Sequence, residues 1–175
     1  TDNKGTKKIK GKNYLSMKLS QNFSLSELSK SSVATRKGID NNPNEAQIDN
    51  LKNLCDNVLQ KVRDQFGAVT ITSGFRSAQL CVEIGSSVNS QHTASDNSAA
   101  ADFECIGTSN ALVADWIFQN CEFDQLILEF FTPGEPNSGW VHCSYSSKKN
   151  RKQYLRAYKE NGKTLYKPVL GKMEE

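Results

Sequence analysis

The chain has 175 residues, 37% of them hydrophobic and 23% charged, with a formal net charge of +3. This length and composition suit one globular domain with a buried core. No run of 18 apolar residues occurs, which excludes a membrane-spanning helix. The five cysteines are an odd number without a CxxC pair, and most lie in apolar segments. This favours buried, reduced thiols over a disulfide framework or a zinc knuckle.

Basic residues gather at both ends of the chain. Residues 4–18 hold six lysines, and residues 148–172 hold nine Lys or Arg against one acid, Glu160. Such segments either form a solvated surface or attract an anionic polymer such as cell-wall glycan or nucleic acid. No nucleic-acid motif with interleaved aromatic residues accompanies them, so we expect no nucleic-acid partner.

Helical and strand patterns alternate along the rest of the chain. A capping box at Ser24 and Glu27 begins the first helix, and apolar residues at three- and four-residue spacings mark the longest one. Asn161-Gly162 is the strongest hairpin signal. The expected elements are helices over 24–30, 44–66, 77–84 and 109–120, and strands over 69–73, 100–106, 125–131, 139–144, 154–159 and 163–169. This order predicts an α+β domain.

The chain has only two histidines, His92 and His142, and Asp102 follows the first by ten residues. Two imidazoles and a carboxylate from separate segments are the usual protein ligands of a catalytic zinc ion. Each histidine can equally be an ordinary hydrogen-bonded residue, and spacing alone does not decide between these interpretations. On its predicted strand His142 alternates with Val141 and Cys143, so one face can carry a site and the other the core.

Several motifs occur in a familiar order: Ser73-Gly74-Phe75-Arg76-Ser77, Ile84-Gly85-Ser86-Ser87, Ser90-Gln91-His92, Ala100-Ala101-Asp102-Phe103 and Gly139-Trp140-Val141-His142. Together they resemble the zinc D-alanyl-D-alanine carboxypeptidases and related phage endolysin peptidases, which share the hedgehog-like fold. Residues 23–28 and 123–127 also resemble phage-borne members. The resemblance implies one peptidase-like domain over 22–155, a small antiparallel sheet with flanking helices. A basic arm over 1–21 would precede it, and a hairpin with a basic tail over 156–175 would follow.

The same resemblance implies a zinc ion bound by His92, Asp102 and His142. The spacing departs from the family pattern, Ser-x-His-x-x-Gly-x-Ala-x-Asp. Ser95 and Ala99 stand where that pattern has its Gly and Asp, and three extra residues within 95–98 restore the match at Asp102. Such an insertion costs little in a loop. Asp96 is a rival ligand.

The resemblance also suggests catalytic residues. Arg76 matches the family's arginine, which would bind a carbonyl or carboxylate of the substrate; its alternative role is a surface salt bridge. Many relatives carry a Glu or His three residues before the second zinc histidine, where this chain has Gly139. Glu129 is the leading candidate for the general base, followed by Glu104 and Asp124, although each can be an ordinary exposed carboxylate. Trp140 can line the site or fill the core.

The function implied is that of a zinc peptidase that hydrolyses the stem peptides of peptidoglycan, as a D-alanyl carboxypeptidase or an endopeptidase. We expect it to be phage-borne, made in the host cytoplasm, and active at the bacterial cell wall during lysis or wall penetration, with other virion proteins as potential partners. The alternative is a non-catalytic virion or wall-binding module on the same fold. The inserted residues and Gly139 favour that alternative. A nucleic-acid-binding protein is a third option, supported by charge alone.

Overall fold

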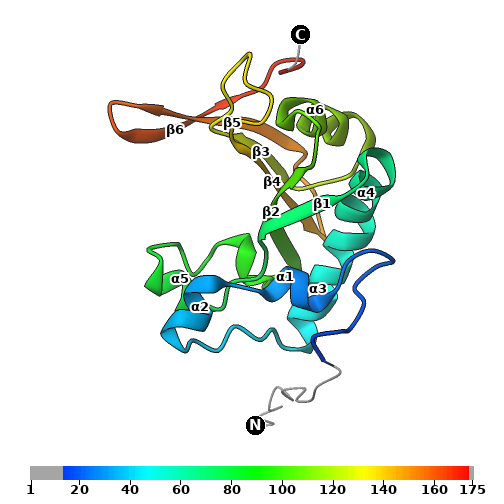
Figure 1. Ribbon diagram of the computed structural model, residues 1–175, viewed down its shortest axis with the longest axis vertical. Coiled ribbons are helices and arrows are strands. Elements are labelled where there is room, and N and C mark those ends of the chain that lie inside the picture. Colours follow the sequence, from blue (N-terminus) through cyan, green and yellow to red (C-terminus); the bar gives the residue numbers. More distant parts are fainter. Residues whose placement is uncertain (1–13, 174–175) are drawn as a thin grey trace.

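Six strands form one sheet in the computed structural model, which describes residues 14–173 (Figure 1). Their order is β1-β2-β4-β3-β5-β6, and every neighbouring pair is antiparallel except β3 and β5. The strands are β1 (Val69–Ser73), β2 (Ser98–Cys105), β3 (Gln125–Glu129), β4 (Trp140–Ser146), β5 (Gln153–Glu160) and β6 (Lys163–Pro168). The predicted α+β domain with a small, mainly antiparallel sheet is confirmed. Residues 1–13 of the expected basic arm lie outside the described part.

The longest helix consists of α3 (Glu45–Leu54), a π-helical turn η1 (Cys55–Leu59) and α4 (Gln60–Phe66). It begins with a capping box, in which the Asn44 side chain accepts from the backbone of Gln47 and the Gln47 side chain accepts from the backbone of Asn44. Its apolar stripe is buried from Ile48 to Val62, through the π turn, and Phe66 at its end is partly buried. The single helix predicted over 44–66 is therefore confirmed.

The shorter helices are α1 (Leu25–Ser29), α2 (Ser32–Lys37), α5 (Ala78–Glu83) and α6 (Asn110–Asn120). All except α2 match the predicted helices to within a few residues. Helix α2 has no predicted counterpart. Ser31 caps its first turn and Gly38, in the left-handed region at φ 65°, ends it.

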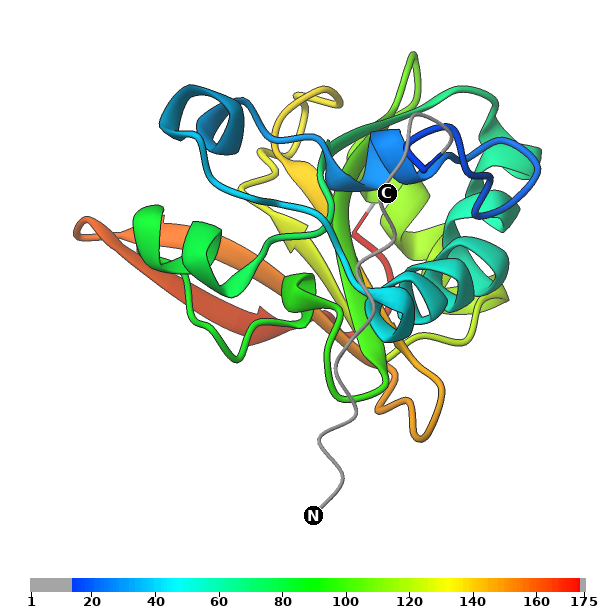
Figure 2. The same ribbon diagram turned by 90° about the horizontal axis from the view of Figure 1, so that it is seen from below.

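The two faces of the sheet have different roles. Helices α3, α4 and α6 lie on one side of it, whereas α5 lies toward the other side (Figure 2). Side chains that alternate along β2 and β4 and point toward the helices form the core, among them Ala101, Phe103, Val141 and Cys143. Asp102 and His142 consequently point to the opposite face.

All five cysteines are buried and free. Within residues 14–173, no helix is both long and apolar enough to cross a membrane.

Candidate metal centre

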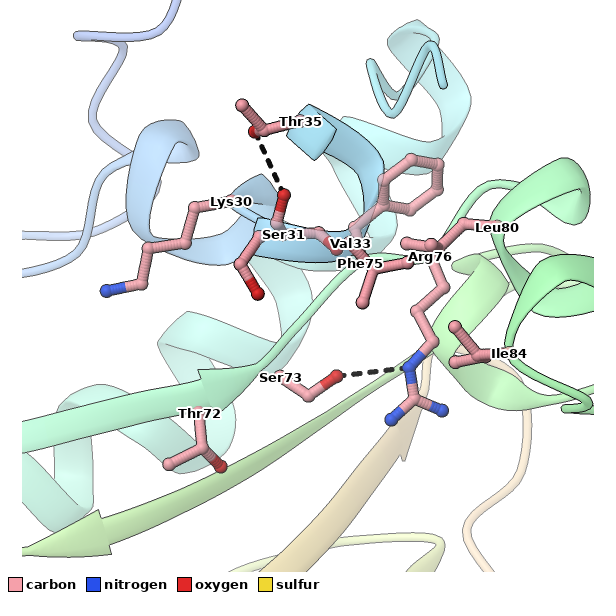
Figure 3. A pocket seen from close by; sticks show the side chains of 11 residues that line it. Lys30, Ser31, Val33, Thr35, Thr72, Ser73, Phe75, Arg76, Leu80 and Ile84 are labelled. Carbon is pink, nitrogen blue, oxygen red and sulfur yellow. Dashed lines mark hydrogen bonds between the residues drawn. The ribbon is translucent and has the colours of Figure 1, made fainter. Parts of the chain in front are cut away.

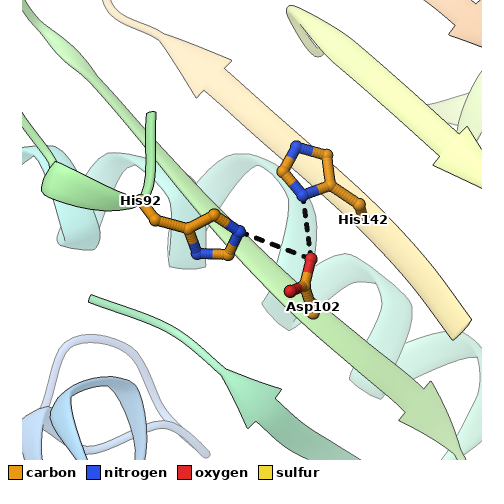
Figure 4. A group of neighbouring side chains, drawn as sticks. All are labelled: His92, Asp102 and His142. Carbon is orange, nitrogen blue, oxygen red and sulfur yellow. Dashed lines mark hydrogen bonds and ion pairs between the residues drawn. The ribbon is translucent and has the colours of Figure 1, made fainter. Parts of the chain in front are cut away.

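Three side chains from separate segments meet on the open face of the sheet. Asp102 on β2 pairs directly with His142 on the adjacent strand β4, and His92 comes from the 3-10 turn η2 (Gln91–Thr93). Asp102 Oδ1 lies 2.8 Å from His142 Nδ1 and 3.4 Å from His92 Nε2 (Figure 4). One ligand atom from each residue lies within 4.8 Å of the other two. The three predicted ligand residues are thus brought together, in a geometry that can hold a metal ion.

The orientation of His92 suits metal binding. Its Nδ1 lies 2.8 Å from the carbonyl oxygen of Gly74, so Nδ1 carries the proton and donates it. The unprotonated Nε2 then faces Asp102, as metal-binding histidines with a backbone partner commonly do. Burial lowers the pKa of His92, chiefly through desolvation. The ring is therefore neutral, which is the form that binds a metal.

Residue 74 is a glycine because its backbone packs directly against helix α1. A Cβ atom at this position would lie 2.3 Å from the carbonyl oxygen of Leu28, which also accepts a hydrogen bond from Phe75 N at 2.6 Å. Only glycine permits this approach. Buried Asn41 holds the same turn, since it donates to Phe75 O and accepts from Ser77 N. The Ser-Gly-Phe-Arg-Ser motif is thus the support for His92.

Asp102 is the charged centre of the group. Burial alone would raise its pKa, but its contacts with the two imidazoles, first of all the hydrogen bond from His142, outweigh this effect and hold the pKa well below its usual range. Arg76 Nη2 lies 3.3 Å from the second oxygen, Oδ2, and Arg76 Nε donates to Ser73 Oγ at 3.0 Å. Arg76 therefore forms its salt bridge within the site rather than on the outer surface.

The group lies in an open cleft of about 520 Å³, here called the metal cleft. Besides the three metal-site residues, its lining includes Arg76, Gln91, Glu129, Trp140, Arg151 and Tyr166. Arg76 also lines a second cavity of about 520 Å³, which includes Ser73 and the hydroxyl groups of Ser31, Thr35 and Thr72 (Figure 3). Arg76 thus lies between two hollows.

Glu129, the leading candidate for the general base, lies in the metal cleft on strand β3. Burial raises its pKa, and the charge of Asp102 raises it further, while His142 and Arg76 act in the opposite direction. Trp140, its direct partner on β4, also lines the cleft, and its ring packs against Phe130 at a centroid distance of 5.3 Å. A carboxylate of raised pKa in a cleft is a recognised mark of a functional site.

The other candidate acids are placed differently. Asp124 accepts hydrogen bonds from Arg151, through N, Nε and Nη2, and from Gln91 Nε2, so its oxygens are occupied. Glu104 accepts from Asn110. Asp96 is exposed and lines another hollow, apart from the grouped metal-site residues.

The extra residues near Ser95 form a turn between η2 and β2. Ala94, Asp96 and Asn97 all have positive φ, at 51°, 52° and 63°. Helix α3 holds the start of this turn, where Asn50 Nδ2 donates to Ala94 O at 2.8 Å. The turn absorbs the additional length before β2 begins, so Asp102 keeps its register with His142.

Tyr166 in the cleft lining was not among the residues selected from the sequence. The sequence feature that could have identified it is the alternation of side chains between the two faces of the predicted hairpin. Tyr166 pairs with Ala157, which pairs in turn with Glu129, so the three residues share one face of the sheet.

Comparison with known protein families shows that residues 21–144 match the family described as peptidase M15. This span includes helix α1, strands β1 to β3 and the part of β4 that carries His142. It does not include the β5–β6 hairpin. A comparison with curated proteins found no match.

Proposed function

Because the chain belongs to the peptidase M15 family, we propose that it is a zinc-dependent peptidase that hydrolyses the stem peptides of bacterial peptidoglycan. The reaction would be that of a D-alanyl carboxypeptidase or an endopeptidase. The observation that carries the proposal is the grouping of His92, Asp102 and His142 within an open cleft. A phage-borne enzyme for lysis or wall penetration is the setting that we propose for this activity.

The donor set fits zinc. Peptidases of this family are zinc-dependent, and two imidazoles with one carboxylate leave the fourth position of a tetrahedral site open. The hydrogen bond from His92 Nδ1 to Gly74 fixes the ring so that Nε2 is available. When bound, zinc would lower the pKa of a water molecule to about 7 and polarise the scissile carbonyl.

Glu129 is the residue that we assign to proton transfer. Its carboxylate would accept a proton from the attacking water and deliver it to the nitrogen of the departing amine. Its raised pKa suits both steps, because a base is most effective when its pKa approaches the working pH. Gly139 lacks a side chain, so Glu129 would take the role that relatives assign to the position three residues before the second histidine.

Arg76 would position the substrate. Ser73 and Asp102 hold its guanidinium at the edge of the cleft. Its planar set of donors suits a peptide carbonyl or a terminal carboxylate. We propose that Arg76 binds this group of the peptide and so orients the scissile bond over the metal site.

The basic hairpin fits an anionic bacterial wall. Arg156, Lys159, Lys163 and Lys167 all lie on β5 or β6, the strands next to the metal cleft. Positive charge raises the rate of encounter with an anionic polymer. We therefore propose that the protein acts at the cell wall after synthesis in the host cytoplasm, free or associated with other virion proteins.

Digestion of purified peptidoglycan tests the activity. Zinc-loaded protein is incubated with walls of several chemotypes, with and without a chelator, and the released fragments are identified by mass spectrometry. We expect chelator-sensitive release; loss of single D-alanine residues would indicate a carboxypeptidase, and larger peptides an endopeptidase. Absence of release by protein with confirmed zinc would refute the proposal.

A non-catalytic wall-binding or virion module on the same fold is the second candidate. Gly139 favours it, because no side chain exists where relatives carry a proton-transferring residue. Sedimentation with peptidoglycan, without release of fragments from it, would support this candidate.

A further inference from the structure

The β5–β6 hairpin supplies one wall of the metal cleft, although it lies outside the residues that match the family. Its contribution is Tyr166. The register runs from Glu129 on β3 to Ala157 on β5 and on to Tyr166 on β6. Paired residues point to the same face of a sheet, so Tyr166 lies in the same row as Glu129.

The Tyr166 ring is available to a ligand. The residue is 55% exposed, although it lines a cleft. A tyrosine offers an apolar ring and a hydroxyl donor with little loss of side-chain entropy, which suits it to peptide binding. Burial and the charge of Glu129 raise the pKa of Tyr166, so its hydroxyl stays protonated at neutral pH.

Side-chain contacts support the hairpin that carries Tyr166. The Lys167 ammonium lies 5.1 Å from the centre of the Tyr158 ring, and Lys159 lies 5.6 Å from that of Phe130. At the base of the hairpin Arg151 is bonded to buried Asp124. A hairpin that is already ordered loses less entropy when a ligand binds to it.

The separation between metal site and Tyr166 sets a length scale. Strands β4 and β6 are three positions apart in the sheet order, which corresponds to about 14 Å at the usual strand spacing. This is the separation of the strand backbones, and the Tyr166 side chain covers part of it, because Tyr166 lines the same cleft as His142. A peptide that extends beyond the scissile dipeptide can therefore contact Tyr166 while it occupies the metal site.

We propose that Tyr166 is a substrate-binding residue that contacts the peptide beyond the scissile dipeptide, and that it makes the protein selective for extended peptides over dipeptides. This inference rests on the proposed peptidase function. It adds a requirement for substrate length and assigns that requirement to a hairpin beyond the family match.

Steady-state kinetics with Tyr166→Ala test the proposal. For a stem pentapeptide we expect KM to rise about tenfold while kcat stays within about twofold, since the lost contact is remote from the reacting bond. Tyr166→Phe should restore most of the binding. Leu165→Ala is the matched control, because Leu165 is next to Tyr166 on β6, so it points to the other face and does not line the metal cleft; its KM should equal that of the wild type.

Substrate length provides the second readout. Peptides are extended one residue at a time from the scissile dipeptide, in both directions, and kcat/KM is compared between the wild type and Tyr166→Ala. The ratio should stay near one for the dipeptide and rise to about ten in the longer peptides that contact Tyr166. An unchanged KM, or a ratio independent of length, in an active enzyme would overturn this inference alone. A zinc-loaded wild type that cleaves no peptide would overturn the proposed function and this inference with it.

Discussion

The backbone of Gly139 packs directly against that of Glu129: a Cβ atom at position 139 would lie 2.0 Å from the Glu129 carbonyl oxygen. Gly139 also has φ +66°, which side-chain-bearing residues rarely adopt. The position that holds a proton-transferring residue in relatives can therefore hold only glycine here. The same contact fixes the strand position of Glu129 beside His142.

Gly139→Ala should thus destabilise the protein strongly. We expect the free energy of unfolding to fall by about 3 kcal/mol or more, through steric overlap and backbone strain together, as measured by urea denaturation. Gly134→Ala is the control: Gly134 also has positive φ, +86°, but a Cβ there would meet no atom within 4 Å. That variant should lose only about 1 kcal/mol. Equal losses in the two variants would argue against the packing contact.

Glu129→Gln should abolish proton transfer while leaving the metal site intact. We expect kcat/KM to fall by a factor of about 10² to 10⁴, with zinc content unchanged. The wild-type rate should fall as the pH drops through the pKa of Glu129, since the base must be ionised. Because that pKa is raised, this acid limb should lie above the ordinary glutamate value of about 4.3. A variant with wild-type kcat/KM would exclude Glu129 as the base.

The elements of the fold that could be predicted are those whose sequence has a clear local pattern. The 44–66 helix follows from its apolar periodicity, and the β5–β6 hairpin follows from Asn161-Gly162. Helix α2 was missed because only Ala34 among its residues is buried, so it carries no apolar stripe. The parallel pairing of β3 with β5 depends on contacts between distant segments, which periodicity does not encode.

Asp102→Asn tests which aspartate completes the metal site. We expect its zinc affinity to fall about 100-fold or more, since even a partner outside the ligand shell contributes 10- to 100-fold. Asp96→Asn is the control, because Asp96 is exposed and lies apart from the metal-site group. It should bind zinc like the wild type in a competition titration with a chromogenic chelator. The reverse order would identify Asp96 as the ligand.

Asp124→Asn should weaken the hydrogen bonds that support two sides of the metal cleft. Asp124 bonds to Gln91, next to His92, and to Arg151, at the base of the hairpin. Because Arg151 is half exposed, we expect a modest loss of about 1–2 kcal/mol in the free energy of unfolding at pH 7.

The pH dependence of that loss has a defined sign. Burial opposes ionisation of Asp124, but its bonds to Arg151 and Gln91 prevail and lower its folded-state pKa. A lowered pKa contributes stability above the unfolded value of about 3.9, and this contribution disappears as the pH falls toward the folded value. Denaturation curves should therefore show a constant difference between wild type and variant above about pH 5, narrowing below about pH 4. A difference that persists unchanged at low pH would contradict the ionic role.

The sequence indicated which residues form the candidate site better than it indicated their hydrogen bonds and positions. The chain has only two histidines, His92 and His142, and Asp102 belongs to a strand motif. Few combinations of ligand residues were therefore possible. Strand register and loop geometry decide three further features of the site. These are the hydrogen bond from His92 to Gly74, the hydrogen bonds from Arg151 to Asp124, and the position of Tyr166 in the cleft lining. A one-residue change of register reverses the face of every side chain, and the sequence alone does not specify it.

The most direct test of the central claim is a titration of activity against bound zinc. Chelated protein receives zinc in steps from zero to two equivalents, and the rate of stem-peptide hydrolysis is measured at each step. The account predicts that the rate rises linearly and stops rising at one equivalent per chain. Hydrolysis that survives complete removal of zinc, or saturable zinc binding without any hydrolysis, would contradict it.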